Sequence, residues 1–418
     1  MTSLDPSMVS LPKRTLPIGA FPLPFGYLLL PVSNVADNGG VEAIRVGLLN
    51  GLLPEQWPPA LRGYELTLAE DYDGALAAFG GDDAVSRFNR FVIDPDSADV
   101  DRLRADLGDQ LGALVELVLF VLGRTDVIPA PDGMSGELAA LALAASAALE
   151  LAADRADVAV GMLTEAVGHA GPVSRALAGV LHGAVALAYR QSGDLGSASE
   201  ELIAGIALLT DTDLRIACAE QHLELAGMYH EKAGEHRDLL AKAIHHYHCA
   251  LQTITEEQSP EVWASAHFNL ATAYLTMPMI EASDHLRLGV AVASLRAALK
   301  VYTQETHPHQ WSSAQLNLAN ALVYAPSTHQ ADNLVEAVEL YEAVLVARNR
   351  TDDPLGYARV LANQGNALAH LGMFDHARGK LVESRFIFEE FHEYEAVTSV
   401  RGLLDELARS STLAAAEI

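Results

Sequence analysis

The sequence predicts an all-α protein: a superhelical solenoid of stacked antiparallel helix pairs, preceded by a divergent helical N-terminal region. Apolar residues recur at three- and four-residue spacing through nearly the whole chain from about residue 134 onward. A segment that begins with proline and closes with a large residue recurs in the second half of the chain. No convincing run of alternating polar and apolar residues, which would predict a strand, occurs anywhere.

The repeat is clearest in three segments of the C-terminal half. They are 260–274 (PEVWASAHFNLATAY), 308–322 (PHQWSSAQLNLANAL) and 354–368 (PLGYARVLANQGNAL). The proline, an aromatic residue, an asparagine and a large closing residue keep the same spacing in all three. Weaker copies end at Tyr189 and Tyr229. One such helix pair cannot bury its apolar face alone, so we expect the pairs to stack.

The N-terminal third follows a different pattern. Residues 1–40 are rich in proline and lack helical periodicity, so we expect an extended arm, ordered only where it lies on the rest of the protein. Residues 41–130 predict a divergent helical region, with helices over 41–53, 59–70, 72–79, 98–106 and 109–123. The segment 87–92 gives no defined prediction.

A helical repeat array is predicted over 134–392. Each first helix is followed by a second one, expected over 194–209, 237–255, 286–304, 333–348 and 374–390. A degenerate earlier pair is expected over 135–151 and 154–168. Residues 393–418 predict a capping helix, over 394–409, and a C-terminal tail.

Single residues in the repeats support this division into helices. Proline suits the first helical turn, where its missing N–H costs nothing, and glycine suits a helix C-terminus that needs positive φ. Small residues permit close approach of neighbouring helices. These signals are Pro260, Pro308 and Pro354 for helix starts, Gly372 for a helix end, and Ala271, Ala319 and Gly365 for close contacts.

These segments resemble the tetratricopeptide repeat (TPR) family, which has Asn-Leu-Gly and Tyr on a first helix and a small Ala on a second. The last repeat matches best, through Asn363, Gly365, Leu368, Gly372 and Ala377. The resemblance covers 170–392 clearly and 134–169 weakly. Segment 71–79 also resembles a TPR turn and second helix, which would make the molecule one continuous solenoid with 1–40 lying over it. The resemblance does not otherwise cover 1–130.

The resemblance implies a concave groove, lined by the first helices, that binds a peptide or loop of a partner. An asparagine amide is both donor and acceptor, so it can pair with an extended peptide backbone. Alternatively, these amides satisfy the backbones of neighbouring helices. The residues expected along the groove are Asn269, Asn317 and Asn363, with Asn320 and Asn366 three residues on, and Arg359.

Some family members hold a peptide carboxylate with basic residues beside the asparagine. Here Leu316 and Ala362 occupy positions where such a clamp would need lysine, and Arg359 is the only nearby cation in that stretch. We therefore expect no carboxylate clamp. A groove in so acidic a chain should prefer basic or neutral segments.

Three possible metal ligands lie on the helix expected over 237–255. His245, His248 and Cys249 share one flank of that helix, and three nitrogen and sulfur ligands could hold Zn or Ni. The flank borders an apolar face, however, where histidine often packs. No Cys-x-x-Cys or His-Glu-x-x-His motif accompanies them. The sequence therefore predicts neither a metal nor a cofactor.

Composition narrows the function. The chain of 418 residues has 27 Lys and Arg against 55 Asp and Glu, a formal net charge of −28. This acidity argues against nucleic acid and anionic membranes as partners. Two cysteines and the absence of a recognisable secretory signal or membrane span predict a cytoplasmic protein, and the use of few lysines suggests a bacterial one.

No phosphate loop, dinucleotide fingerprint or nucleophile elbow is present, so we expect no enzymatic activity. The leading hypothesis is a non-enzymatic protein interaction scaffold or adaptor. One alternative is an assembly or maturation factor for a multi-subunit metalloenzyme. Another is an enzyme with an unrecognised site in the N-terminal third. The sequence leaves self-association open.

Overall fold

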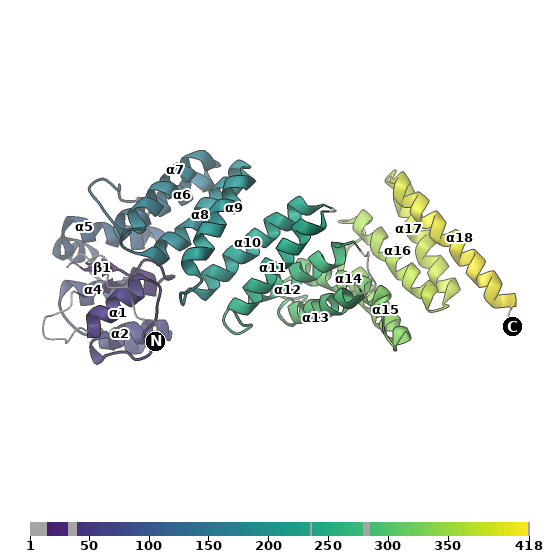
Figure 1. The fold of residues 1–418 in the computed structure, drawn as a ribbon, viewed down its shortest axis with the longest axis horizontal. Coiled ribbons are helices and arrows are strands. Elements are labelled where there is room, and N and C mark those ends of the chain that lie inside the picture. The colour runs from purple at the N-terminus through teal and green to yellow at the C-terminus, as the bar shows by residue number, and fades with distance from the viewer. Residues whose placement is uncertain (1–14, 32–39, 235, 279–284, 417–418) are drawn as a thin grey trace. The chain divides into compact units, whose positions relative to one another are not determined.

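A computed structural model describes residues 15–31, 40–234, 236–278 and 285–416 (Figure 1). The predicted fold class is confirmed: the described chain is all-α and consists mainly of antiparallel helix pairs, apart from one pair of two-residue strands. The chain forms two compact units, Met1–Leu225 and Ala226–Ile418. No helix in the described ranges has both the length and the apolar character needed to cross a membrane.

The described part of the predicted arm, residues 15–31, contains a small hairpin, and residues 1–14 and 32–39 of that prediction lie outside the described residues. Strand β1 (Leu16–Pro17) pairs antiparallel with β2 (Leu29–Leu30), and the 3-10 helix η1 (Phe25–Tyr27) lies between them. Ile18 and Leu28 are fully buried. This segment therefore contributes large apolar side chains to the core, and the two short strands are elements that the sequence did not predict.

Short helices follow the hairpin. They are α1 (Gly40–Leu49), η2 (Pro59–Leu61), α2 (Arg62–Leu68), α3 (Tyr72–Ala78), α4 (Ala84–Ile93), η3 (Pro95–Ser97) and α5 (Val100–Val121). The predicted break between 98–106 and 109–123 corresponds to a kink at Gly108, which has φ +72°. Helices α2 and α3 have only seven residues each, so the resemblance of 71–79 to a repeat does not extend to helix length.

Helix α4 has no counterpart among the predicted helices. Asp83 caps it by accepting a hydrogen bond from the Ser86 N–H, at 3.0 Å. Phe88 and Phe91 point into the core and are fully buried. The helix has only ten residues, but its buried apolar residues Phe88, Phe91 and Val92 follow helical spacing, a signal that was present in the sequence.

The first unit ends in longer pairs that match the predicted array. They are α6 (Glu137–Ala152), α7 (Ala156–Ala170), α8 (Arg175–Ser192) and α9 (Leu195–Leu209), each packed against the next. Helix α10 (Arg215–Ala233) contains the division between the units. Within the first unit, the Gln221 side chain donates to the Gly179 carbonyl of α8, at 2.8 Å.

The second unit continues with regular pairs and the C-terminal helix. Its elements are α11 (Arg237–Thr253), α12 (Pro260–Thr276), α13 (His285–Val301), α14 (Pro308–Tyr324), α15 (Gln330–Ala347), α16 (Pro354–His370), α17 (Phe374–Glu390) and α18 (Tyr394–Ala416). The three prolines stand at helix starts as predicted, and Gly372 has φ +76° after α16. The predicted boundaries between domains stay predictions.

Close contacts between helices occur where small residues were expected. Ala271 and Ala319 are fully buried. A Cβ at Gly365 would lie 2.8 Å from the Leu381 Cγ of α17, so α16 and α17 could not pack this closely with a larger residue there. The small residues therefore set the spacing of these helices.

Candidate functional site

The asparagines of the second unit occupy equivalent positions on three neighbouring helices. Helices α12, α14 and α16 each have 17 residues and begin with proline, which fixes a common register. Helix α14 contacts both of the others. We call the five predicted asparagines the amide face: Asn269 on α12, Asn317 and Asn320 on α14, and Asn363 and Asn366 on α16. All five are half-buried.

Hydrogen bonds within the protein use three of these amides. The Asn320 Oδ1 accepts from the Asn363 Nδ2 at 3.0 Å and from the Tyr341 hydroxyl at 2.7 Å. Burial raises the pKa of Tyr341, so its hydroxyl stays a donor. The Asn366 Nδ2 donates to the Tyr324 hydroxyl at 3.2 Å. The two bonds from Asn363 and Asn366 join α16 to α14, and the bond from Tyr341 joins α15 to α14.

The same arrangement is not repeated between α12 and α14. Thr272 occupies on α12 the place that Asn320 has on α14, and its hydroxyl donates to the Phe268 carbonyl of its own helix, at 3.0 Å. The side-chain amide of Asn317 consequently forms no hydrogen bond to any residue that the structure describes. The Asn269 Nδ2 makes only a long contact, 3.4 Å, with the Ser265 hydroxyl. The Asn317 side chain therefore has both its N–H donors and its carbonyl acceptor free for a ligand. The Asn269 side chain has its carbonyl acceptor free and is only weakly bonded through its Nδ2.

The chemistry around the amide face is polar but carries little charge. Hydroxyl groups of Ser265, Thr272 and Tyr324 lie on the same helices, and the Tyr324 side chain is exposed. Arg359 on α16 is exposed and forms no ion pair with a described residue. Such a surface has no array of charges for a carboxylate or a phosphate and offers instead the donors and acceptors that suit an amide backbone.

The structure brings together only two of the three candidate metal ligands. The Cys249 Sγ lies 3.7 Å from the His245 Nε2, whereas the His248 Nε2 faces the Tyr274 hydroxyl at 3.0 Å. Burial raises the pKa of the Cys249 thiol, which disfavours the thiolate that a metal needs. Among the described residues, no group of three His, Cys, Asp or Glu side chains could hold a metal ion.

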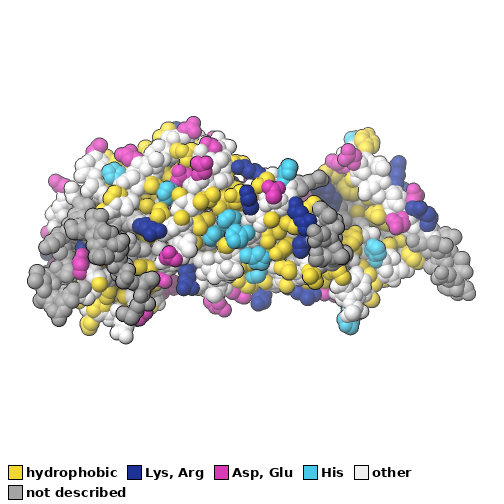
Figure 2. All heavy atoms as spheres, in the orientation of Figure 1, with side chains coloured by type: hydrophobic (Ala, Val, Ile, Leu, Met, Phe, Trp, Pro, Cys, Tyr) yellow, Lys and Arg dark blue, Asp and Glu magenta, His cyan; other side chains and the backbone are white. Residues whose placement is uncertain are grey.

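A cluster of histidines and aromatic residues in α10, α11 and α12 is a feature that the sequence did not predict as such. Figure 2 shows a group of histidine side chains on the face in view, over the region of α11. His246 stacks on Tyr229, with ring centroids 5.8 Å apart, and His267 lies edge to face with Trp263, at 4.4 Å. Desolvation and the nearby His248 and Lys300 lower the pKa of His267 to about 4. His267 is therefore uncharged at neutral pH.

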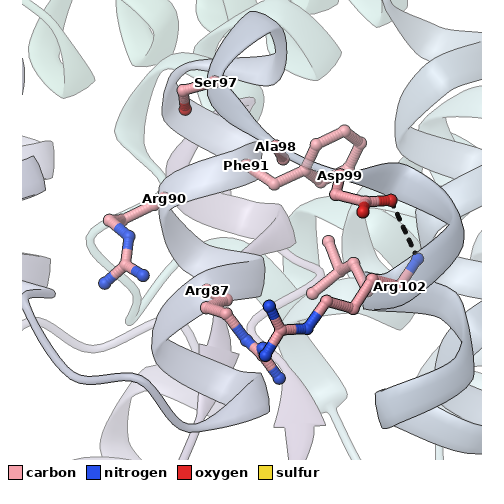
Figure 3. A pocket seen from close by; sticks show the side chains of 8 residues that line it. Arg87, Arg90, Phe91, Ser97, Ala98, Asp99 and Arg102 are labelled. Atoms are coloured by element: carbon pink, nitrogen blue, oxygen red, sulfur yellow. Dashed lines mark hydrogen bonds between the residues drawn. The ribbon is translucent and has the colours of Figure 1, made fainter.

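Arginines of the first unit line a second feature that sequence reasoning missed. Arg87 and Arg90 on α4 and Arg102 on α5 surround a cavity of about 160 Å³ (Figure 3). The three-residue spacing of Arg87 and Arg90 was visible in the sequence, but α4 itself was not defined there. The approach of Arg102 depends on the turn between the helices.

No protein-family model and no curated protein matches this chain. Solved structures that resemble it include RapI in its apo form, which is 12% identical, with 84% of this chain and 96% of that one covered and a TM-score of 0.46. A Rap protein complexed with competence and sporulation factor is 13% identical, with 85% and 98% covered and a TM-score of 0.41. BtubC from P. vanneervenii is 17% identical, with 60% and 91% covered and a TM-score of 0.38. Likeness this distant carries no argument about function, and the TPR-like fold rests on the helix pairs described above.

Proposed function

We propose that the chain is a non-enzymatic interaction scaffold that binds an extended peptide or loop of a partner protein along the amide face of α12, α14 and α16. The observation that carries the proposal is Asn317. Its half-buried amide has no hydrogen-bonding partner among the described residues, although its helix is held in register with both neighbours. A polar group in that position gains most from a ligand that supplies both a donor and an acceptor.

The bonded amides have a supporting part in this proposal. Asn320 and Asn363 are bonded to each other, and Tyr341 fixes the orientation of Asn320. They hold α14 and α16 in place before a ligand arrives, which lowers the entropy lost on binding. Asn317 and Asn269 then make the contacts with the peptide, and the exposed Arg359 lies at the margin.

Charge determines which peptides fit. The chain carries a net charge of −28, so its long-range field attracts basic segments and repels acidic ones. The five residues of the amide face are all uncharged asparagines. The expected ligand is thus an extended segment, neutral where it contacts the asparagines and free to carry basic residues beyond them.

The experiment is capture of partners from a native lysate on immobilised full-length protein. The test bait carries Asn269→Ala with Asn317→Ala, and the control bait carries Asn333→Ala. Asn333 on α15 is also a half-buried helical asparagine whose side chain forms no hydrogen bond to a described residue, but it lies on the second helix of its pair. We expect a partner that binds the wild type and the control and is lost from the double variant.

A partner held equally by all three baits would contradict the proposed location. The identity of a captured protein also separates the narrower hypotheses. Subunits or accessory proteins of a metalloenzyme would favour an assembly factor, and other proteins would favour an adaptor. Circular dichroism of each variant checks that the helices are intact.

A further inference from the structure

The cavity between α4 and the start of α5 is a concentration of positive charge in an acidic protein. Arg87 and Arg90 on α4 and Arg102 in the first turn of α5 line it; the guanidinium groups of Arg87 and Arg102 lie close together, whereas that of Arg90 points away from them (Figure 3). The cavity measures about 160 Å³, more than ten times the roughly 10–15 Å³ that one water molecule requires. It can therefore admit a polyatomic ion. The whole chain has 27 basic residues against 55 acidic ones, so three arginines around one cavity are notable.

Each arginine already has a partner, but Arg87 and Arg102 share a single carboxylate. Arg87 donates a hydrogen bond to Asp106, and the Arg102 Nε lies 3.7 Å from the same Asp106 oxygen. Arg90 donates to the uncharged carbonyls of Phe79 and Gly81. The cavity lining contains one further carboxylate, Asp99.

The positions of Arg87 and Arg102 favour an anionic ligand. Two guanidinium groups that share one carboxylate repel each other, and a second anion between them relieves that repulsion. The Arg87 Nε is buried and has no hydrogen-bonding partner among the described residues. The Arg102 side chain is 65% exposed, so its free N–H groups can turn toward a ligand from solvent.

We propose that this cavity binds a phosphate group. A guanidinium presents planar pairs of N–H donors that match the oxygens of an oxyanion, and several guanidiniums together suit a phosphate because it has more acceptor oxygens than a carboxylate. Arg87 and Arg102 supply the contacts, and Arg90 lines the wall of the cavity. The phosphate is either a free ion or a group carried on a protein side chain. This site is separate from the amide face.

The test is calorimetric titration of the full-length protein with sodium phosphate and, in a second arm, with a short phosphoserine peptide that carries no other charge. Arg102→Gln is expected to weaken binding at least about tenfold, because it removes charge-assisted hydrogen bonds. The control is Arg155→Gln. Arg155 is also an exposed arginine beside one carboxylate, Glu150, but it lies away from the cavity, and its loss should leave binding unchanged.

A second variant is expected to strengthen phosphate binding. Asp99 accepts a hydrogen bond from the Arg102 backbone N–H at 3.1 Å and thereby caps α5. Asn caps a helix about as well as Asp, so Asp99→Asn keeps the cap and removes a negative charge from the cavity lining. We expect phosphate to bind several-fold more tightly, an increase that a purely structural role of these residues would not produce.

The outcomes separate clearly. Tighter binding of the peptide than of the ion, lost in Arg102→Gln, assigns the site to a phosphorylated protein, whereas equal binding of both assigns it to the free ion. The proposal is overturned if neither probe binds at concentrations up to about 10 mM, a range in which even weak sites fill. It is also overturned if Arg102→Gln and Arg155→Gln bind as the wild type does.

Discussion

The N-terminal region, residues 15–121, and the helix pairs α12 to α17 bury their apolar side chains in different ways. The N-terminal region packs large residues such as Ile18, Leu28, Phe88 and Phe91 from elements that do not repeat. The helix pairs bring small residues together at equivalent positions, where a side chain as small as that of Ala319 is fully buried. A repeated contact can be predicted from spacing, whereas a contact made once depends on the particular tertiary arrangement. Mutations should therefore act differently in the two regions.

The largest effect is expected for Phe88→Ala in the N-terminal region. Phe88 is fully buried, and truncating a buried phenylalanine costs about 3–5 kcal/mol. Hydrogen exchange followed by mass spectrometry should show lost protection in 40–121. Phe386→Ala on α17, where the ring is 57% exposed, is the control and should change stability by less than about 0.5 kcal/mol. An equal loss of protection in α12 to α17 of the Phe88 variant would contradict the expectation that mutations act differently in the two regions.

The next effect concerns the hydrogen bonds that hold the hairpin. Asn89 on α4 is buried, accepts from the Leu29 N–H at 2.8 Å and donates to the Leu29 carbonyl at 3.2 Å. Asn89→Leu keeps the volume but leaves the Leu29 N–H buried and unpaired, which should cost about 2–3 kcal/mol. Denaturant unfolding followed by exchange in 15–31 measures the loss.

Tyr64→Phe makes the matched comparison for Asn89. The Tyr64 hydroxyl also donates to the Leu29 carbonyl, but its removal leaves Asn89 as a donor to that oxygen. The loss should be nearer 1 kcal/mol. If Tyr64→Phe proves the more damaging variant, the hairpin is not held mainly by Asn89.

Acid should act on the second unit through its histidine cluster. The pKa of His267 is lowered to about 4, and desolvation also lowers those of His230, His246 and His248. The unfolded chain binds protons more readily than the folded one, so stability is full above about pH 6.5 and falls as the pH drops toward 4. Because His267 is partly exposed, we expect its contribution to be about 1–2 kcal/mol.

Exchange protection of α11 and α12, compared between pH 7 and pH 5, measures this effect. His267→Gln should reduce the difference between the two conditions, since glutamine does not titrate. His329→Gln is the control, because the His329 side chain is 76% exposed. A pH response that is the same in wild type and His267→Gln would show that other groups carry it.

The smallest effect separates the two kinds of asparagine on the amide face. Asn320→Ala leaves the buried Tyr341 hydroxyl and the Asn363 amide without their acceptor and should cost about 1 kcal/mol. Asn317→Ala breaks no hydrogen bond to a described residue and should change stability by a few tenths of a kcal/mol at most. Chemical denaturation measures both. Equal losses would mean that Asn317 also supports the fold.

The sequence by itself determined the regular helices. The second helix expected over 374–390 is α17 to the residue, and that expected over 237–255 ends two residues earlier, at Thr253. Apolar spacing, a proline at N1 and a glycine after the C-terminus act within one or two turns of a helix, so they can be interpreted without knowing its neighbours. The equivalent positions of the asparagines followed from the same register.

Only the tertiary structure decided which of those asparagines keep free amides. The Asn363 side chain is bonded because Asn320 lies at the matching position of the preceding first helix. At the same position before Asn317 lies Thr272, whose hydroxyl is bonded to its own helix. Likewise, Arg102 and Asp106 are neighbours on α5 at i,i+4 spacing, but only the packing of α4 against α5 brings Arg87 to the same carboxylate. The physical reason is the same in each case. A hydrogen bond or an ion pair between helices depends on what the neighbouring helix places within about 3–4 Å, and local spacing in one sequence does not contain that information.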